Sequence, residues 1–168
     1  KIYFLSDLHL GARTIADPRA HEKRVVRWLD SIKSDASAIY LMGDILDFWF
    51  EYKTVVPRGY TRFLGKIAEL SDMGIDIHWF TGNHDIWIFD YLPKELGITV
   101  HHGPEMLNLA GKTFFLAHGD GPVRRRLILL PAAGPRNANF YSLLRLIAYS
   151  RSILVSSTDI QFLSGIIV

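Results

Sequence analysis

Apolar and polar positions follow two different rhythms along this chain, one typical of strands and the other of helices. Residues 2–5 and 38–42 are apolar runs, as expected for strands that are buried in a parallel sheet. Residues 75–80 form a third predicted strand. Between them, a stretch that begins at Pro18 and another over residues 60–73 carry apolar residues at helical spacing. The order strand-helix-strand-helix-strand predicts an α/β sheet.

Two further patterns follow the third predicted strand. Residues 106–109 and 113–117 are apolar segments joined by a short link that contains glycine, which predicts a β-hairpin. Residues 140–154 again place apolar side chains near helical spacing, beside two arginines. We interpret this stretch as a helix packed on the domain; the alternative is a helical cap that lies on an acidic membrane face or over acyl chains.

Composition narrows the class of protein. With 168 residues, 49% of them hydrophobic and 21% charged, the chain is expected to form one globular domain, and disordered or fibrous classes are excluded. The absence of cysteine excludes thiolate chemistry and cysteine-bound zinc, and it is typical of a reducing compartment. We found neither a leader pattern nor a long apolar run, so the sequence predicts a cytoplasmic location.

The net charge of +2 hides an uneven distribution. Residues 1–120 carry a balance of −3, whereas residues 121–168 carry +5, and every base in that second part is arginine. A basic region of this kind is compatible with nucleic-acid binding. We favour the simpler interpretation, a tail of unusual composition, and so do not expect nucleic acid as a partner.

Polar side chains follow each predicted strand at its carboxyl end. Asp7 and His9 follow the first strand, Asp44 follows the second, Asn83 and His84 follow the third, and His118 follows the hairpin. Taken singly, each of these segments reads as a turn or a cap. Four of them in succession predict a shared site, because ligands of α/β sheets bind at the carboxyl ends of the strands.

These side chains are suitable ligands for metal ions. Carboxylate, imidazole and amide donors without sulfur favour Mn²⁺, Fe or Zn²⁺, and a carboxylate can bridge two cations. Two metal ions about 3.5–4 Å apart activate water and neutralise the charge of a phosphoryl group. His84 is then placed to protonate a leaving oxygen or to stabilise the transition state. The remaining histidines are interpreted as ordinary surface or strand residues: His21, His78, His101 and His102.

The four segments resemble the motifs of the calcineurin-like metallophosphoesterases. The similarity covers residues 1–121, and within the family the segment 43–49 looks like that of bacterial UDP-2,3-diacylglucosamine diphosphatases rather than protein phosphatases, whose Asp-Arg-Gly is absent. The matching motifs are Asp7-x-His9, Gly43-Asp44, Gly82-Asn83-His84-Asp85 and His118-Gly119-Asp120.

The resemblance implies a fold, a ligand set and a reaction. The fold is an α/β sandwich of mixed sheets flanked by helices. Asp7 and His9 would hold one metal ion, Asp44 would bridge both, Asn83 and His118 would hold the second, and His84 would act near the leaving group. The metal is expected to be Mn²⁺. The expected reaction is hydrolysis of UDP-2,3-diacylglucosamine to UMP and 2,3-diacylglucosamine 1-phosphate in lipid A biosynthesis, with peripheral contact at the inner face of the inner membrane.

Two departures from the family keep alternatives open. Some diphosphatases of this pathway have arginine at the position of His84, and family members add a late Gly-His-x-His motif, whereas no histidine follows His118 here. We therefore expect a single domain, residues 1–168, and a sandwich incomplete at its C-terminal end. Residues 122–168 would form an atypical tail that derives from a shifted reading frame or a misassigned segment of the gene. The alternatives are another calcineurin-like phosphodiesterase, acting on nucleotides or nucleic acid, and a truncated, inactive remnant.

Overall fold

A computed structural model describes residues 1–110, 112–119, 156–157 and 160–164. The interpretation of residues 140–154 as a helix lies outside these residues. The helices are α1 (Pro18–Ile32), α2 (Thr61–Asp72) and α3 (Tyr91–Leu96). The strands are β1 (Ile2–Ser6), β2 (Ala38–Met42), β3 (Asp76–Phe80), β4 (Thr99–His101), β5 (Glu105–Leu109), β6 (Lys112–Leu116), β7 (Ser156–Ser157) and β8 (Ile160–Ser164).

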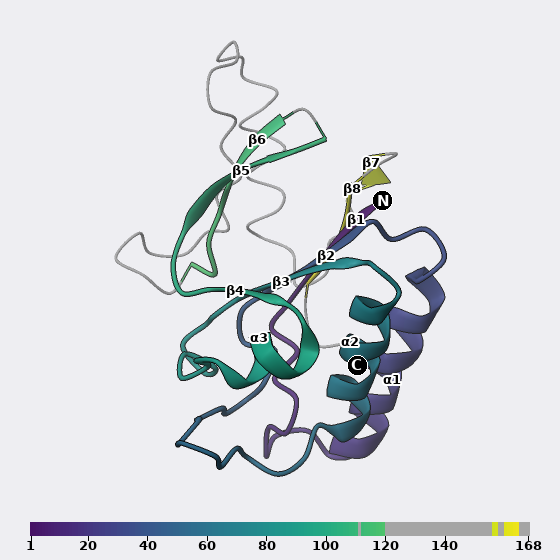
Figure 1. The fold of residues 1–168 in the computed structure, drawn as a ribbon. Coiled ribbons are helices and arrows are strands. Elements are labelled where there is room, and N and C mark those ends of the chain that lie inside the picture. Colours follow the sequence, from purple (N-terminus) through teal and green to yellow (C-terminus); the bar gives the residue numbers. More distant parts are fainter. Residues whose placement is uncertain (111, 120–155, 158–159, 165–168) are drawn as a thin grey trace.

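The main sheet has the strand order β4-β3-β2-β1-β8-β7, and all of its pairs are parallel except β7 with β8 (Figure 1). Residues 38–41 of β2 pair in register with residues 2–5 of β1, and residues 76–80 of β3 pair with residues 38–42. The predicted α/β class and its three buried strands are confirmed. Parallel pairing brings the carboxyl ends of β1, β2 and β3 to one edge of the sheet.

Helices α1 and α2 lie side by side along one face of the main sheet (Figure 1). Asp17 caps α1 by accepting a hydrogen bond from the backbone N–H of Ala20 at 2.9 Å, as an N-cap carboxylate does. From α1, Glu22 accepts the N–H groups of Arg62 and Phe63 at the start of α2. One helix therefore supplies the cap of the other, which fixes their relative position.

The two faces of the sheet are buried against different partners. Alternate residues of β1 and β2, such as Leu5 and Leu41, pack with the helices in the larger core. Their neighbours Phe4 and Tyr40 point to the opposite face, where they pack with Leu116 of β6. The hairpin β5-β6, which the sequence predicts, is thus a second layer opposite the helices.

Several elements were not predicted. Helix α3 precedes strand β4, which extends the sheet at one edge by pairing with β3, and β8 pairs with β1 over residues 160–164. Part of the segment beyond residue 121 therefore contributes a strand to the main sheet; the division into a family-like part and an atypical tail stays a prediction. No helix within the described ranges is both long enough and apolar enough to cross a membrane.

Candidate metal centre

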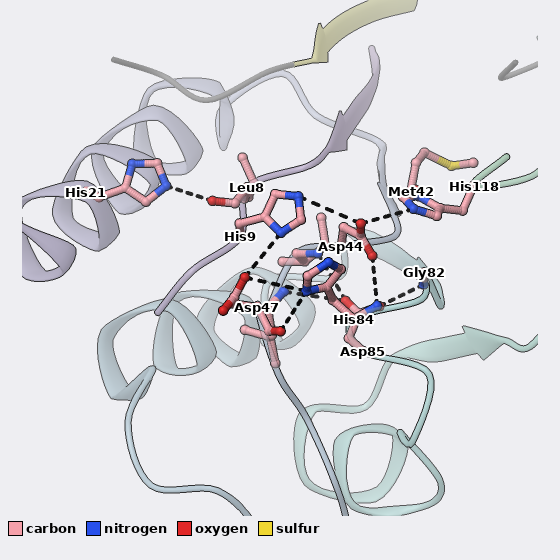
Figure 2. Close-up of polar contacts among 12 residues, drawn as sticks. Leu8, His9, His21, Met42, Asp44, Asp47, Gly82, His84, Asp85 and His118 are labelled. Carbon is pink, nitrogen blue, oxygen red and sulfur yellow. Dashed lines mark hydrogen bonds and ion pairs between the residues drawn. The ribbon is translucent and has the colours of Figure 1, made fainter. Parts of the chain in front are cut away.

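The polar residues that follow β1, β2 and β3 gather at one edge of the main sheet (Figure 2). Three backbone hydrogen bonds join the loops after β1 and β2: Asp7 donates to the carbonyl of Gly43 at 3.1 Å, His9 to that of Asp44 at 2.9 Å, and Leu10 to that of Ile45 at 2.9 Å. The two loops therefore continue side by side beyond the strands, and they carry their side chains into one site.

Asp44 occupies the centre of the arrangement. Its carboxylate belongs to two groups of ligand atoms, one with His9 and His84 and the other with Asp7 and His118, and within each group the atoms lie within 4.8 Å of one another. Its Oδ2 is 3.7 Å from Nε2 of His9 and 3.3 Å from Nε2 of His118. A carboxylate shared by two groups of donors is placed to contact two cations at once.

Residues from two further segments complete the predicted set. Asn83 lies in the loop after β3, directly before His84, and its side chain is exposed. His118 follows β6 and reaches the site from the second layer. The structure thus brings Asp7, His9, His84 and His118 around the Asp44 carboxylate and places Asn83 on an adjoining loop.

Backbone carbonyls orient two of the imidazoles. Nδ1 of His118 lies 2.8 Å from the carbonyl oxygen of Met42, and Nδ1 of His84 lies 2.9 Å from that of Asp47. A carbonyl only accepts, so both Nδ1 atoms must carry a proton and donate it. In the neutral ring Nε2 then keeps its lone pair, and in His118 this atom faces Asp44. Such an arrangement is typical of metal-binding histidine, and with the neighbouring carboxylates it fits divalent cations.

The charges at the centre of the site are strongly coupled. Burial tends to raise the pKa of Asp44, but hydrogen bonds from His118 and from the backbone N–H of His84 outweigh it and lower the pKa. Burial likewise tends to lower the pKa of His118, yet its hydrogen bonds with Asp44 and the carbonyl of Met42 raise it to about 9. Without a metal ion, a proton on His118 supplies the positive charge that the Asp44 carboxylate faces.

The backbone is strained at three of these positions. Asp7, His9 and Asp44 have φ angles of 55°, 43° and 53°, in the left-handed region that residues with a side chain rarely adopt. Strain of this kind costs on the order of 1–3 kcal/mol per residue and is concentrated at functional sites. The hydrogen bonds between the two loops hold these residues in place.

Two glycines leave room for the side chains. A Cβ atom on Gly82 would lie 2.2 Å from Oδ1 of Asp44, and one on Gly43 would lie 2.4 Å from Nδ1 of His118. Gly43 also has a φ of 87°, whereas Gly82 is not in the left-handed region. Gly82 is therefore required for space alone.

Asp47 is a further residue of the site, and its role is not predicted from the sequence. Its carboxylate lies 3.5 Å from Nδ1 of both His9 and His84, and its carbonyl accepts a hydrogen bond from His84. Asp47 follows Asp44 by three residues. This spacing places the two residues near each other but does not predict where the Asp47 side chain points. The path of the loop turns this carboxylate toward the two imidazoles and so positions both rings.

Four histidines were not predicted as site residues, and the structure places them outside the two donor groups around Asp44. His21 was interpreted as a surface or strand residue, which is wrong: it lies in α1, fully buried, with Nε2 2.9 Å from the carbonyl oxygen of Leu8. His78 and His101 are strand residues, as expected, and their facing ring nitrogens are 3.0 Å apart. His102 is exposed.

The fold and this site define the class of protein. The sequence model of the calcineurin-like phosphoesterase family matches residues 1–162, and the chain belongs to that family. Among solved structures, the E. coli phosphoesterase Yfce superimposes with a TM-score of 0.48 and 19% identity, over 98% of this chain and 79% of that one. Phosphoesterases of this family use divalent metal ions, and the two donor groups around Asp44 offer them a site.

The chain also has relatives of known name. It is 60% identical over 124 residues to the UDP-2,3-diacylglucosamine hydrolase of Porphyromonas gingivalis, covering 74% of this chain and 47% of that protein. The enzyme of the same name from Neisseria gonorrhoeae is 33% identical over 119 residues, covering 70% and 48%. The chain spans about half the length of the curated relatives it matches.

Proposed function

We propose that this chain belongs to an enzyme that hydrolyses UDP-2,3-diacylglucosamine to UMP and 2,3-diacylglucosamine 1-phosphate. The observation that carries the proposal is the Asp44 carboxylate, shared by two groups of metal-ligand atoms, in a chain 60% identical to a relative named for this substrate. The reaction adds water across one P–O bond of the diphosphate, so that each product keeps one phosphate.

The proposed ligand set is the one that the family resemblance implies, whereas the donor atoms around Asp44 group differently in the structure, His9 with His84 and Asp7 with His118. Asp7 and His9 would hold one divalent cation, Asn83 and His118 the other, and Asp44 would contact both, with Mn²⁺ as the expected metal. Bound cations supply the Lewis acidity that neutralises phosphate charge and makes water nucleophilic.

His84 is the proposed catalytic side chain. Because its Nδ1 donates to the carbonyl of Asp47, the ring is held with Nε2 available to the substrate. A protonated Nε2 can deliver its proton to the leaving phosphate oxygen as the P–O bond breaks. The Asp47 carboxylate, 3.5 Å from Nδ1, is a second contact that orients the ring.

An apolar surface beside the metal centre supports a substrate with a lipid part. Seven of the nine large hydrophobic side chains that are exposed in the described part of the chain lie on two short segments, 48–55 and 86–89, which adjoin Asp47 and His84. Exposed apolar patches of this kind mark binding sites for apolar partners. We name it the apolar loop surface; its members are Phe48, Phe50, Tyr52, Val55, Ile86, Trp87 and Phe89.

We place the acyl chains of the substrate against the apolar loop surface. The rim of this surface would contact the cytoplasmic face of the inner membrane. Membrane contact of this kind predicts that the protein floats with vesicles of phosphatidylethanolamine and phosphatidylglycerol. Flotation should weaken when Trp87 and Phe89 are changed to serine together. Equal flotation of the wild type and this variant contradicts the assignment of the surface to the membrane.

Product analysis tests the proposed reaction. Mass spectrometry should detect UMP and a lipid monophosphate after incubation with UDP-2,3-diacylglucosamine and Mn²⁺, and little turnover of UDP-N-acetylglucosamine, which lacks the acyl chains. Faster turnover of a soluble nucleotide diester or of nucleic acid ends would assign the site to another calcineurin-like phosphodiesterase.

A further inference from the structure

Asp85 is a buried carboxylate that no step of the proposed reaction uses. Its side chain is fully buried, and it accepts hydrogen bonds from two loops and one indole. Figure 2 shows Asp85 beside Gly82 and the Asp44 loop. Oδ1 accepts the backbone N–H of Gly82 at 2.7 Å, while Oδ2 accepts those of Ile45 at 3.0 Å and Leu46 at 3.4 Å and the indole N–H of Trp79 at 3.2 Å.

The donors lie next to the metal-binding residues on both loops. Ile45 directly follows Asp44, and Gly82 directly precedes Asn83. The parallel register of β2 with β3 ends at the pair Met42 and Phe80, before either loop begins. Beyond this point, the Asp85 carboxylate takes the place of the strand ladder and joins the two loops.

A second contact depends on the same spacing. The backbone N–H of His84 donates to Oδ1 of Asp44 at 3.0 Å, which orients the carboxylate that both donor groups share. If the loop after β3 moved away from the loop after β2, this bond would lengthen. Asp44 would then lose its orientation, and Asn83 its distance from Asp44.

We propose that Asp85 is the positioning residue of the metal pair: it holds the Asp44 loop and the Asn83 loop at the separation that lets one carboxylate serve two ions. This inference rests on the proposed two-metal centre. Asp85 itself contacts no ion, since backbone and indole N–H groups occupy both of its oxygens. It acts through the loops.

The chain offers a matched control in Glu51. This carboxylate is also buried and also accepts only N–H donors in the contacts described: the indole of Trp49 at 3.0 Å and the backbone N–H groups of Phe89, Asp90 and Tyr91. Its donors lie further along the same two loops and at the start of α3, and none of them adjoins Asp44 or Asn83 in the chain. Glu51→Gln therefore makes the same chemical change as Asp85→Asn at a contact between these loops that does not involve the neighbours of Asp44 and Asn83.

Electron paramagnetic resonance of Mn²⁺-loaded protein compares the Asp85 and Glu51 variants directly, because two neighbouring Mn²⁺ ions give a spin-coupled spectrum. We expect the coupled spectrum from the wild type and from Glu51→Gln. We expect uncoupled single ions from Asp85→Asn, with Mn²⁺ affinity lowered by about 10–100-fold, as for other residues that orient metal ligands. A coupled pair of unchanged affinity in Asp85→Asn overturns the proposal.

The wild-type spectrum distinguishes failure of the two-metal centre from failure of the proposed role of Asp85. If the wild type shows no coupled pair, the two-metal centre fails, and the role of Asp85 fails with it. If the wild type and Asp85→Asn both show the pair, only the role of Asp85 fails.

Hydrogen exchange of the metal-free wild type gives a test that does not depend on a variant's folding. The amides of Ile45, Leu46 and Gly82 should exchange slowly and at similar rates, because one carboxylate holds all three. Rapid exchange at these amides would show that Asp85 does not join the loops, and would overturn the proposal.

Discussion

At the scale of single residues, the metal centre depends on glycine positions, where the lack of a side chain leaves room for the metal ligands. Gly82 faces Oδ1 of Asp44, and an added Cβ would lie 2.2 Å from that oxygen and 2.6 Å from the Asp44 nitrogen. The backbone conformation at this position does not require glycine, so the effect of a larger residue is purely steric. One methyl group would push the shared carboxylate out of place.

Gly82→Ala is therefore expected to lower Mn²⁺ affinity by about tenfold or more, measured by calorimetric titration. Gly65→Ala in α2 is the matched control, since nothing lies within 4 Å of a Cβ at that position. The control should retain full Mn²⁺ affinity and raise the free energy of unfolding by about 0.5–1 kcal/mol, because alanine favours the helix. Equal Mn²⁺ affinity in the two variants would exclude the steric role of Gly82.

A second residue-scale prediction concerns Tyr40, which is buried in the core beneath the hairpin. Burial, and to a smaller extent the charge of Asp76, raise the pKa of Tyr40 from 10.0 to about 12. The folded chain therefore holds this proton more tightly than the unfolded chain. The resulting stability is fully present below pH 10 and is lost as the pH rises through 12.

The loss amounts to about 2–3 kcal/mol and belongs to the hydroxyl group. Tyr40→Phe cannot ionise, and the phenyl ring can keep the stacking on Phe4 and His78. Its free energy of unfolding should decline less steeply than that of the wild type between pH 10 and pH 12, as measured by urea denaturation. Parallel declines would show that Tyr40 does not carry this dependence.

The sequence predicts which residues form the site better than it predicts their orientation. Asp7, Asp44 and His84 follow apolar runs, and parallel strands must bring such ends together. The roles of Asp47 and Asp85 depend on the path of the loops beyond the strands. That path includes left-handed residues and contacts between distant segments, for which the linear pattern holds no signal.

At the scale of elements, the two loops that bear the apolar loop surface form one unit. Glu51 accepts backbone N–H groups from the start of α3, and the rings of Phe48 and Phe50 both contact Trp87, with centroids 6.1 Å and 6.0 Å apart. The exposed aromatic rings are thus held in place by the carboxylate beneath them. A rigid apolar surface of this kind orders a lipid at a lower entropic cost than a flexible one.

Trp87→Ser should therefore affect lipid substrate selectively. We expect kcat/KM for UDP-2,3-diacylglucosamine to fall by about tenfold or more, since burial of a large side chain contributes about 1.5–3 kcal/mol. Hydrolysis of the soluble diester bis(p-nitrophenyl) phosphate should fall much less. Met73→Ser, at an exposed apolar position outside this surface, is the control. An equal loss with both substrates would mean that Trp87 supports the metal centre rather than the lipid.

Elements with strong local patterns were predicted, and those that depend on distant partners were not. Helices α1 and α2 show clear periodicity, and the hairpin β5-β6 has a short link, so each can be found locally. Helix α3 and strand β4 are short, with only residues 91–96 and 99–101. Strand β8 pairs with β1 from the other end of the chain, and the sequence of residues 160–164 alone does not predict that pairing.

At the scale of the whole molecule, the architecture explains why this edge of the sheet carries the chemistry. The helices bury one face and the hairpin covers the other, and the hairpin leads into His118 at the same edge as the strand-end loops. Both layers therefore contribute to a single centre. The family assignment, which extends over residues 1–162, agrees with β8 lying beside β1 in the main sheet.

The proposed function requires that Asp44 serve two metal ions during hydrolysis of a UDP-linked lipid. The most direct measurement is Mn²⁺-dependent release of UMP from UDP-2,3-diacylglucosamine by the wild type, by Asp44→Ala and by Asp30→Ala, whose carboxylate is exposed on α1. We predict release that requires Mn²⁺, is unchanged in Asp30→Ala and falls on the order of 10³-fold in Asp44→Ala. Release that persists in Asp44→Ala, or in the presence of a chelator, would contradict the proposed two-metal hydrolysis.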